Sequence, residues 1–282
     1  MTVSNGRRPT TSADARAPGG PGRTTGAPSR TTPIVLVPGA WTTGAAFDDV
    51  RDDLEAHGHR TRIVDLPAHA RRLPQLDRGG LAAIDRTLAE AIGASDAPPV
   101  LVGHSLGGLA CLRAARRHEL AGLVLLMPAP PTGLVRSMLG GALRRPVNSL
   151  GLLGAALSMR VATRLSRSRP AGLYSADVTA ETLRRARAFR ADESWVVLAS
   201  LLLGSREPVG PSATPTLVVG GTQDLITPVP LVRRLAEDLG ATYAEVDVAH
   251  AFNEEPTHPL VTRVVLDFLD EHVPGAGDGA AR

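Results

Sequence analysis

Short runs of apolar residues alternate along the chain with longer stretches in which apolar residues recur every three or four positions. The short runs predict β-strands and the longer stretches predict amphipathic helices. The expected strands are Ile34–Val37, Arg60–Val64, Val100–Val102, Gly122–Leu126, Thr216–Val219 and Thr242–Val248. The expected helices are Ala45–His57, Gly79–Ile92, Leu106–His118, Val229–Leu239 and His258–His272. Apolar strands that alternate with helices indicate an α/β fold, with a mainly parallel sheet of about six or more strands flanked by helices.

The same pattern divides the chain into segments. Residues 1–33 are rich in Thr, Pro, Gly and Arg without apolar periodicity, which predicts a disordered N-terminal extension. Residues 34–127 and 213–273 carry the alternation and form two parts of one core. Residues 128–212 are rich in Leu, Ala and Arg without a clear strand, which predicts a helical cap over the carboxyl ends of the strands. Residues 274–282 are expected to form a flexible tail.

One strand-to-helix connection contains a serine between two glycines. The stretch "VGHSLGG" places Gly103 and Gly107 two residues either side of Ser105, which gives the pattern G-x-S-x-G. In a nucleophile elbow this serine occupies a strained turn and its hydroxyl is exposed above the edge of the sheet. The pattern taken alone also fits an ordinary turn between a strand and a helix.

A serine hydroxyl becomes a nucleophile when a base removes its proton and a carboxylate orients that base. Two later strands are followed by residues of these types. Asp224 follows one strand in "VVGGTQDLITP", and His250 follows the next in "VAHAFNEE". The order serine, acid, histidine is one of the orders in which such sites occur.

Taken together, these motifs resemble the α/β-hydrolase superfamily. The segments that carry the resemblance are "VPGAW" (37–41), "DLPAH" (65–69), "VGHSLGG" (102–108), "VVGGTQDLITP" (218–228) and "VAHAFNEE" (248–255). They extend over residues 33–272 apart from the expected cap. The resemblance implies an α/β-hydrolase fold, with Ser105 as nucleophile, Asp224 as acid and His250 as base.

The segment "VPGAW" resembles the HG-x-W oxyanion loop of this family, with Pro38 where histidine is common. The resemblance implies that the Ala40 and Leu106 N–H groups form the oxyanion hole, with the Trp41 N–H as the alternative to Ala40. Residues expected to contact substrate are Trp41, His104, Leu139 and Leu143. For His104, which adjoins the serine, a packing or hydrogen-bonding role is the alternative.

Other residues and relatives fit less well. His258 is a weaker base than His250, and the pair His57 and His59 lacks a third metal ligand. No metal and no cofactor are therefore expected. Serine at the elbow argues against epoxide hydrolases and haloalkane dehalogenases, which use aspartate there. Hydroxynitrile lyases depend on a lysine, which this chain lacks.

The charge is unevenly distributed. All 31 positively charged side chains are arginine, which excludes Schiff-base and phosphate-loop lysine chemistry. Residues 128–212 carry twelve arginines against five acidic residues, net +7, and residues 1–33 carry net +4, so the remainder carries net −8. The cap arginines could solvate its helices, dock on the acidic body, or attract an acidic substrate or acidic carrier domain. The third role would fall to Arg144, Arg145, Arg164, Arg167 and Arg169.

We expect a serine hydrolase that cleaves an ester or thioester of a small to medium, partly apolar acyl substrate through an acyl-Ser105 intermediate. The alternative is an acyltransferase or thioesterase that acts on a natural-product or carrier-bound intermediate, because the sequence does not distinguish water from another acceptor. The less favoured alternative is a non-catalytic ligand-binding protein on a hydrolase scaffold.

The remaining features concern location and partners. The one cysteine, Cys111, excludes an intramolecular disulfide and favours a reducing, cytoplasmic location. No apolar run reaches the roughly 18–20 residues of a membrane span. Few aromatic residues and no recognition motif argue against nucleic-acid binding. The oligomeric state is left open.

The polar composition of residues 1–33 leads to a first prediction. A chain that begins at Thr32 should fold and retain full activity, because the removed residues have little apolar surface to bury. Circular dichroism and ester turnover, compared with the full chain, measure this. Precipitation or loss of activity in the shortened chain would show that the removed residues pack on the core.

Overall fold

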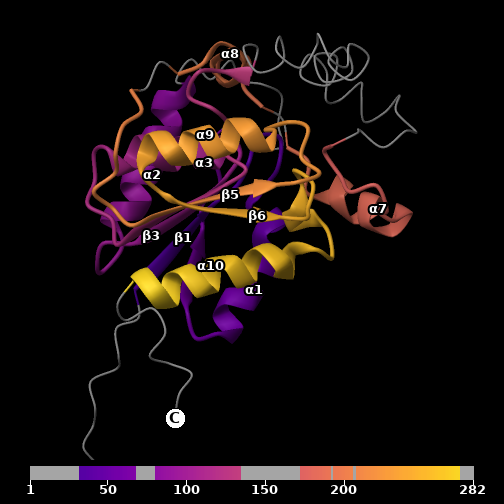
Figure 1. The fold of residues 1–282 in the computed structure, drawn as a ribbon, viewed down its shortest axis with the longest axis horizontal. Helices are drawn as coiled ribbons and strands as arrows, with labels where there is room; N and C mark the ends of the chain where they lie inside the picture. Colours follow the sequence, from indigo (N-terminus) through magenta and orange to yellow (C-terminus); the bar gives the residue numbers. More distant parts are fainter. Residues whose placement is uncertain (1–31, 68–79, 135–171, 192, 206–207, 274–282) are drawn as a thin grey trace, which may run out of the picture.

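A six-stranded parallel sheet forms the centre of the protein, with the strand order β2-β1-β3-β4-β5-β6 (Figure 1). The computed structural model describes residues 32–67, 80–134, 172–191, 193–205 and 208–273. The strands are β1 (Pro33–Val37), β2 (Arg60–Ile63), β3 (Val100–His104), β4 (Gly122–Leu126), β5 (Thr216–Gly221) and β6 (Thr242–Val246). The chain runs outward from β1 to β2 and then returns to place β3 on the other side of β1. Ligands of open α/β sheets bind at such a switch point, here at the carboxyl ends of β1 and β3.

Helices cover both faces of the sheet. The helices are α1 (Asp48–Ala56), α2 (Gly80–Gly93), α3 (Leu106–Ala115), α7 (Ala180–Ala188), α8 (Trp195–Leu203), α9 (Val229–Leu239) and α10 (His258–His272), with short 3-10 helices η1 (Gly44–Phe47) and η3 (Phe252–Glu254). In Figure 1, α1 and α10 lie below the sheet, whereas α2, α3 and α9 lie above it. Each face therefore has a layer of helices to bury its apolar side chains.

Alternate residues of the strands pack against opposite helix layers. Val35 and Val37 of β1 contact the cluster that contains α2, α3 and α9 residues, whereas Ile34 and Leu36 contact the cluster that contains α1 and α10 residues. This is the two-residue period of a β-strand, and it requires β1 to be apolar throughout because both faces are covered. The outer strand β2 has exposed and half-buried positions instead.

The observed elements agree with the expected ones to within a few residues, with four differences. Pro33 is the first residue of β1 and not part of the N-terminal extension. The expected helix 45–57 is divided into η1 and α1, and α3 ends at Ala115. The strand β6 ends at Val246 because the Val246 carbonyl accepts from Thr222 and Val248 N–H groups (both 2.9 Å), which turns the chain out of the sheet.

The segment 128–212 contributes helices to two places. In Figure 1, α7 lies beyond the carboxyl ends of β5 and β6, where a cap was expected. The helix α8 instead packs against α2, and its Val197 and Leu201 side chains belong to the same buried cluster as α2 and α3. Part of this segment therefore completes the core. Residues 135–171 lie outside the described part of the chain.

Among the residues that the structure describes, no helix combines the length and the apolar character needed to cross a bilayer.

A pair of leucines tests the assignment of the core. Leu88 on α2 is 0% exposed and Leu203 at the end of α8 is 75% exposed. We expect Leu88→Ala to lower the free energy of unfolding by about 2–5 kcal/mol, because it removes buried methyl groups and leaves a cavity. The matched control Leu203→Ala should change it by no more than about 0.5 kcal/mol. Urea unfolding measures both values, and similar losses in the two variants would contradict the assignment.

Candidate active site

Ser105 occupies the single residue between β3 and α3. Its backbone has φ 52° and ψ −114°, in a region that L residues other than glycine rarely adopt. Hydrogen bonds hold it there: the Ser105 N–H donates to the Leu126 carbonyl (3.0 Å), and the Ser105 carbonyl accepts from Leu109 (3.1 Å) and Ala129 (2.9 Å). Strained backbone of this kind concentrates at functional sites.

The absence of a side chain at Gly107 lets α3 approach the loop after β1. A Cβ atom at this position would lie 2.2 Å from the Val37 carbonyl oxygen and 2.5 Å from that of Pro38. Since these contacts are with backbone, no side chain is tolerated. The close approach brings the half-buried Ala40 and the first turn of α3 to the same end of the sheet. Leu106 is the first residue of α3, so its N–H has no partner within the helix.

The three side chains that the sequence singled out come together at this edge. The His250 Nε2 atom lies 3.0 Å from the Ser105 Oγ atom, and the His250 Nδ1 atom lies 2.7 Å from the Asp224 Oδ2 atom. A carboxylate oxygen only accepts, so Nδ1 carries the proton and Nε2 offers its lone pair to the serine hydroxyl. This arrangement can remove the proton from Ser105 and transfer it to another atom.

Asp224 is fixed by four donors although it is only 2% exposed. Its Oδ1 atom accepts from the Ile226 N–H (2.7 Å) and the Thr227 N–H (2.9 Å). Its Oδ2 atom accepts from the Thr227 hydroxyl (2.7 Å) as well as from His250. We did not anticipate Thr227 from the sequence. An aspartate that bonds backbone N–H groups two and three residues ahead forms a common turn, so the order D-x-x-T was an available signal.

His104 packs against His250. It is 5% exposed, its Nε2–H donates to the His250 carbonyl (2.8 Å), and its ring lies 4.9 Å from the His250 ring and 5.5 Å from the Phe252 ring. Burial, followed by the neighbouring His250, lowers the pKa of His104 well below its ordinary value. His104 is therefore a neutral packing residue that supports His250, the alternative role considered for it. Its expected contact with substrate stays a prediction.

The other expected substrate residues are only partly placed. Trp41 is half-buried, has φ 60°, and its carbonyl accepts from the Ala191 N–H (2.8 Å). Leu139 and Leu143 lie outside the described part of the chain, as do the five arginines considered for binding an acidic partner.

The alternative histidines are engaged elsewhere. The His258 Nε2 atom lies 3.3 Å from Asp53 Oδ2, and its Nδ1–H donates to the Glu255 carbonyl (2.9 Å), so it does not reach Ser105. His57 Nδ1–H donates to the Asp53 carbonyl (2.7 Å). In the ranges that the structure describes, no group of three or more His, Cys, Asp or Glu side chains is arranged to hold a metal ion.

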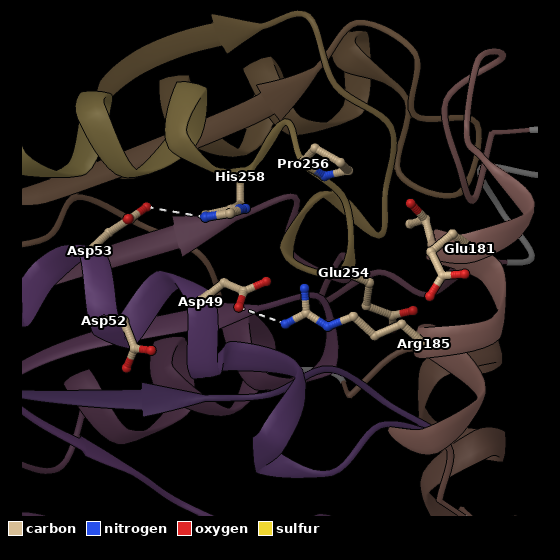
Figure 2. Close-up of a pocket in the computed structure, with 9 residues that line it drawn as sticks. Asp49, Asp52, Asp53, Glu181, Arg185, Glu254, Pro256 and His258 are labelled. Atoms are coloured by element: carbon tan, nitrogen blue, oxygen red, sulfur yellow. Dashed lines mark hydrogen bonds and ion pairs between the residues drawn. The ribbon is translucent and has the colours of Figure 1, made fainter.

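A separate pocket of about 560 Å³ lies between α1, α7 and the start of α10 (Figure 2). Its lining residues are Asp49, Asp52, Asp53, Glu181, Thr182, Arg185, Glu254, Pro256 and His258. Figure 2 shows Arg185 reaching across from α7 to Asp49 on α1, a contact of 2.6 Å. None of Ser105, Asp224 and His250 lines this pocket. One arginine of the basic helix α7 therefore pairs with the acidic helix α1, a contact of the kind that the second of the three explanations for the charge of this segment predicts.

Comparison with known proteins now identifies the family. The family model described as the alpha/beta hydrolase family matches residues 34–263. The chain belongs to the alpha/beta hydrolase family. The expected fold, with a parallel sheet flanked by helices, is confirmed by this match and by the six-stranded sheet.

Among characterised proteins, this alpha/beta hydrolase is similar to a pyrethroid hydrolase of Sphingobium wenxiniae. The two are 28% identical over 262 residues, which covers 85% of this chain and 88% of that protein. Two solved structures share the fold at lower identity. MenH from S. aureus has a TM-score of 0.65 and 17% identity over 86% of this chain and 94% of its own. A thermophilic esterase from Thermogutta terrifontis has a TM-score of 0.60 and 21% identity over 86% of this chain and 90% of its own.

The burial of His104 predicts an acid-sensitive fold. The pKa of His104 is lowered in the folded protein, so the unfolded chain binds the extra proton, and stability is lost as the pH falls below the ordinary value of about 6.5. As the pH falls, the free energy of unfolding of the wild type should decrease relative to that of His104→Asn. The decrease should be at most about 1.4 kcal/mol per pH unit. Urea unfolding at pH 7, 6 and 5 measures it. A difference that stays constant with pH would contradict the prediction.

Proposed function

We propose that this alpha/beta hydrolase is a serine esterase that cleaves an ester or thioester through an acyl-Ser105 intermediate. The observation that carries the proposal is the hydrogen-bonded chain from Ser105 Oγ to His250 Nε2 (3.0 Å) and from His250 Nδ1 to Asp224 Oδ2 (2.7 Å). A nucleophile, a base and an orienting carboxylate in this order are what acyl transfer through serine requires.

In the proposed mechanism His250 takes the Ser105 proton while Oγ attacks the substrate carbonyl carbon. Asp224 stabilises the resulting imidazolium and keeps its ring oriented. The negative charge on the carbonyl oxygen is stabilised by the N–H groups of Ala40 and Leu106, and the loss of one such donor costs about 3–4 kcal/mol of transition-state stabilisation. Trp41 N–H is the alternative donor in the first loop.

The reaction then proceeds through two stages, acylation of Ser105 and deacylation. The leaving group receives the proton from His250 as the carbon–oxygen or carbon–sulfur bond breaks, which leaves the acyl group on Ser105. His250 next removes a proton from water while the water oxygen attacks the acyl carbon. The second tetrahedral intermediate collapses as the bond between the acyl carbon and Ser105 Oγ breaks, and His250 returns the proton to Oγ as the acid is released. If another hydroxyl or amine replaces water in this second stage, the same residues perform acyl transfer.

The comparisons support ester hydrolysis over a binding role. One relative is named a pyrethroid hydrolase and one structural neighbour is named an esterase. The arrangement that this activity needs is also preorganised here, because Asp224 is held by four donors. We therefore propose esters with a small to medium, partly apolar acyl group as the substrate class.

Three substitutions test the proposed roles. We expect Ser105→Ala and His250→Ala to lower kcat by about 10⁴-fold or more, because residues that act as a unit each abolish the pathway. Asp224→Asn should cost somewhat less than either, because it leaves the base in place but disturbs its orientation. Turnover of p-nitrophenyl acetate and butyrate, with mass spectrometry of the trapped acyl-enzyme, measures the losses. A panel of thioesters and added alcohols then distinguishes hydrolysis from acyl transfer.

A fluorophosphonate probe provides the control. The wild type should gain one covalent adduct on Ser105, and Ser105→Ala should gain none. Ser200→Ala is the matched control, because its hydroxyl donates to the Val196 carbonyl within α8 and lies in a different element. If the wild type remains unlabelled while folded, the chain is a binding protein and the esterase proposal is wrong.

A further inference from the structure

The chain just before α7 lies across the loops that follow β5 and β6. The Gly172 carbonyl accepts from the N–H groups of His250 (3.3 Å) and Leu225 (3.4 Å), and the Leu173 carbonyl accepts from Ala251 (2.8 Å). Gly172 has φ +79°, and a Cβ atom there would lie 2.3 Å from the Leu225 Cβ atom. A glycine is therefore required for this close approach. One carbonyl group thus contacts both the loop of the acid and the loop of the histidine.

A buried cluster of three polar side chains extends the same contact. Arg190, just after α7, donates from Nη1 to Glu254 Oε1 (3.0 Å) and from Nη2 to Glu254 Oε2 (2.8 Å). The Tyr174 hydroxyl donates to the same Oε2 atom (2.6 Å), and Arg190 also contacts the Tyr174 oxygen. Glu254 is the fourth residue after His250, so the cluster anchors the loop that carries the histidine.

The cluster is costly to break. The side chains of Glu254 and Arg190 are 2% and 20% exposed. Burial lowers the pKa of the Arg190 guanidinium, but the neighbouring Glu254 and Tyr174 raise it by more, so the net change in this pKa is upward. Burial, with Glu254 second, raises the pKa of Tyr174, which therefore remains a hydroxyl donor. Removal of one partner would leave a buried charge without compensation.

The backbone of Arg190 is paired with a different loop. Arg190 and Thr42 form an antiparallel bridge. The flanking hydrogen bonds are Thr43 N–H to Phe189 carbonyl and Ala191 N–H to Trp41 carbonyl, both 2.8 Å. The loop that contains Ala40 and Trp41 is thus bonded directly to the main chain around Arg190.

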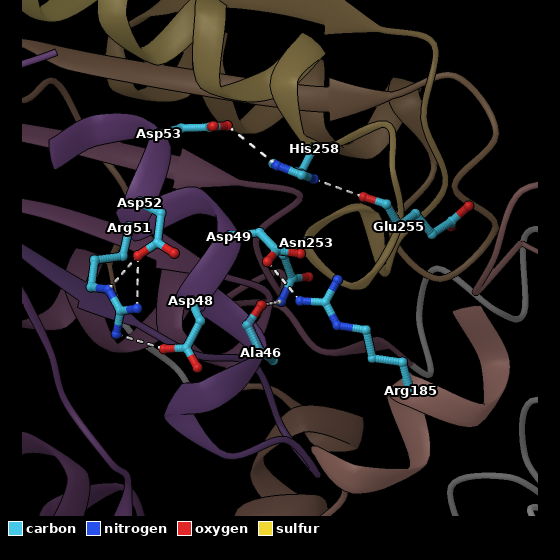
Figure 3. Close-up of polar contacts among 10 residues, drawn as sticks. All are labelled: Ala46, Asp48, Asp49, Arg51, Asp52, Asp53, Arg185, Asn253, Glu255 and His258. Carbon is cyan, nitrogen blue, oxygen red and sulfur yellow. Dashed lines mark hydrogen bonds and ion pairs between the residues drawn. The ribbon is translucent and has the colours of Figure 1, made fainter. Parts of the chain in front are cut away.

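A second link joins the same two loops without Arg190. Figure 3 shows Asn253 of η3 donating from Nδ2 to the Ala46 carbonyl of η1, at 2.9 Å. Within the described ranges, the loop after β1 and the loop after β6 are therefore linked both directly and through Arg190. Of these two links, the one through Arg190 includes a residue from the segment between β4 and β5.

We propose that Arg190 is a positioning residue that holds the His250 loop, through Glu254, and the Ala40–Trp41 loop, through its own backbone, in one arrangement around Ser105. It touches neither substrate nor the reacting atoms. It sets the position of the base relative to the oxyanion donors. This inference rests on the proposed acyl transfer at Ser105.

The test compares Arg190→Met and Arg190→Lys with Arg184→Met in the full chain. Arg184 is the matched control, because it pairs with Glu181 on the exposed face of α7, where both side chains are more than half exposed. The readout is fluorophosphonate labelling, separated into the maximal rate kinact and the half-saturating concentration KI. We expect kinact to fall about 10- to 100-fold in Arg190→Met, because displacement of about 1 Å has such an effect.

The other variants should separate positioning from stability. KI should change little in Arg190→Met, and Arg190→Lys should recover part of kinact, since an ammonium still pairs with Glu254 but not with both oxygens at once. Arg184→Met should label like the wild type. The double variant Arg190→Met/Glu254→Met leaves no unpaired carboxylate at position 254, so the fold should be retained. Its kinact should still be lower than that of the wild type. A folded double variant with the kinact of the wild type would overturn the proposal.

A second measurement tests the role of Arg190 even if the protein is not an esterase. If the folded wild type does not label, amide hydrogen exchange replaces the probe, because it requires no activity. The Thr43 and Ala251 amides should then exchange faster in the Arg190→Met/Glu254→Met variant than in Arg184→Met. Equal exchange in the two variants would show that Arg190 holds neither loop.

Discussion

The site depends on one backbone constraint, the turn from β3 into α3 within the single residue Ser105. With φ 52°, this residue ends the strand and starts the helix at once, and its Oγ atom lies 3.0 Å from His250 Nε2. The first N–H groups of α3 have no partners within the helix. The turn requires Gly103, because a Cβ atom there would lie 2.4 Å from the Gly107 carbonyl oxygen. Gly107 in turn lets the end of β1 lie against the helix, with the Val37 and Pro38 carbonyl oxygens where any side chain would clash. This contact brings the loop that carries Ala40 to the same end of the sheet as Leu106, the two expected oxyanion donors, and Ser105, the proposed nucleophile.

Sequence patterns predicted the sheet and the three central side chains because each follows an apolar strand. Ser105, Asp224 and His250 lie after β3, β5 and β6, and the carboxyl ends of parallel strands meet at one edge. The Arg190–Glu254 pair could not be predicted in this way, because its members are 64 residues apart and neither follows a strand directly. The place of α8 was also missed: a helix that is apolar on nearly all sides carries no stripe to show which neighbour it packs against.

At least two arginines in the segment between β4 and β5 form ion pairs with the rest of the protein. The two ion pairs differ in how much they contribute to stability. Arg185 and Asp49 are 50% and 27% exposed, and exposed pairs of this kind contribute about 0–1 kcal/mol. Glu254 is buried and the Arg190 side chain is 20% exposed, so the pair contributes little to stability in net terms, but the loss of one partner is strongly destabilising. We therefore expect the loss of one partner of the Arg190–Glu254 pair to disturb the structure more than the loss of one partner of the Arg185–Asp49 pair.

The sheet alone does not explain how the base is positioned. The strand β6 lies at the edge of the sheet and ends at Val246, four residues before His250, so no sheet hydrogen bond reaches the imidazole. The His250 N–H bonds to Gly172, its carbonyl accepts from His104, and its loop is anchored by Glu254. Of these contacts, those of Gly172 and Arg190 come from the segment inserted between β4 and β5. That segment is therefore part of the structure that orients His250, the proposed base.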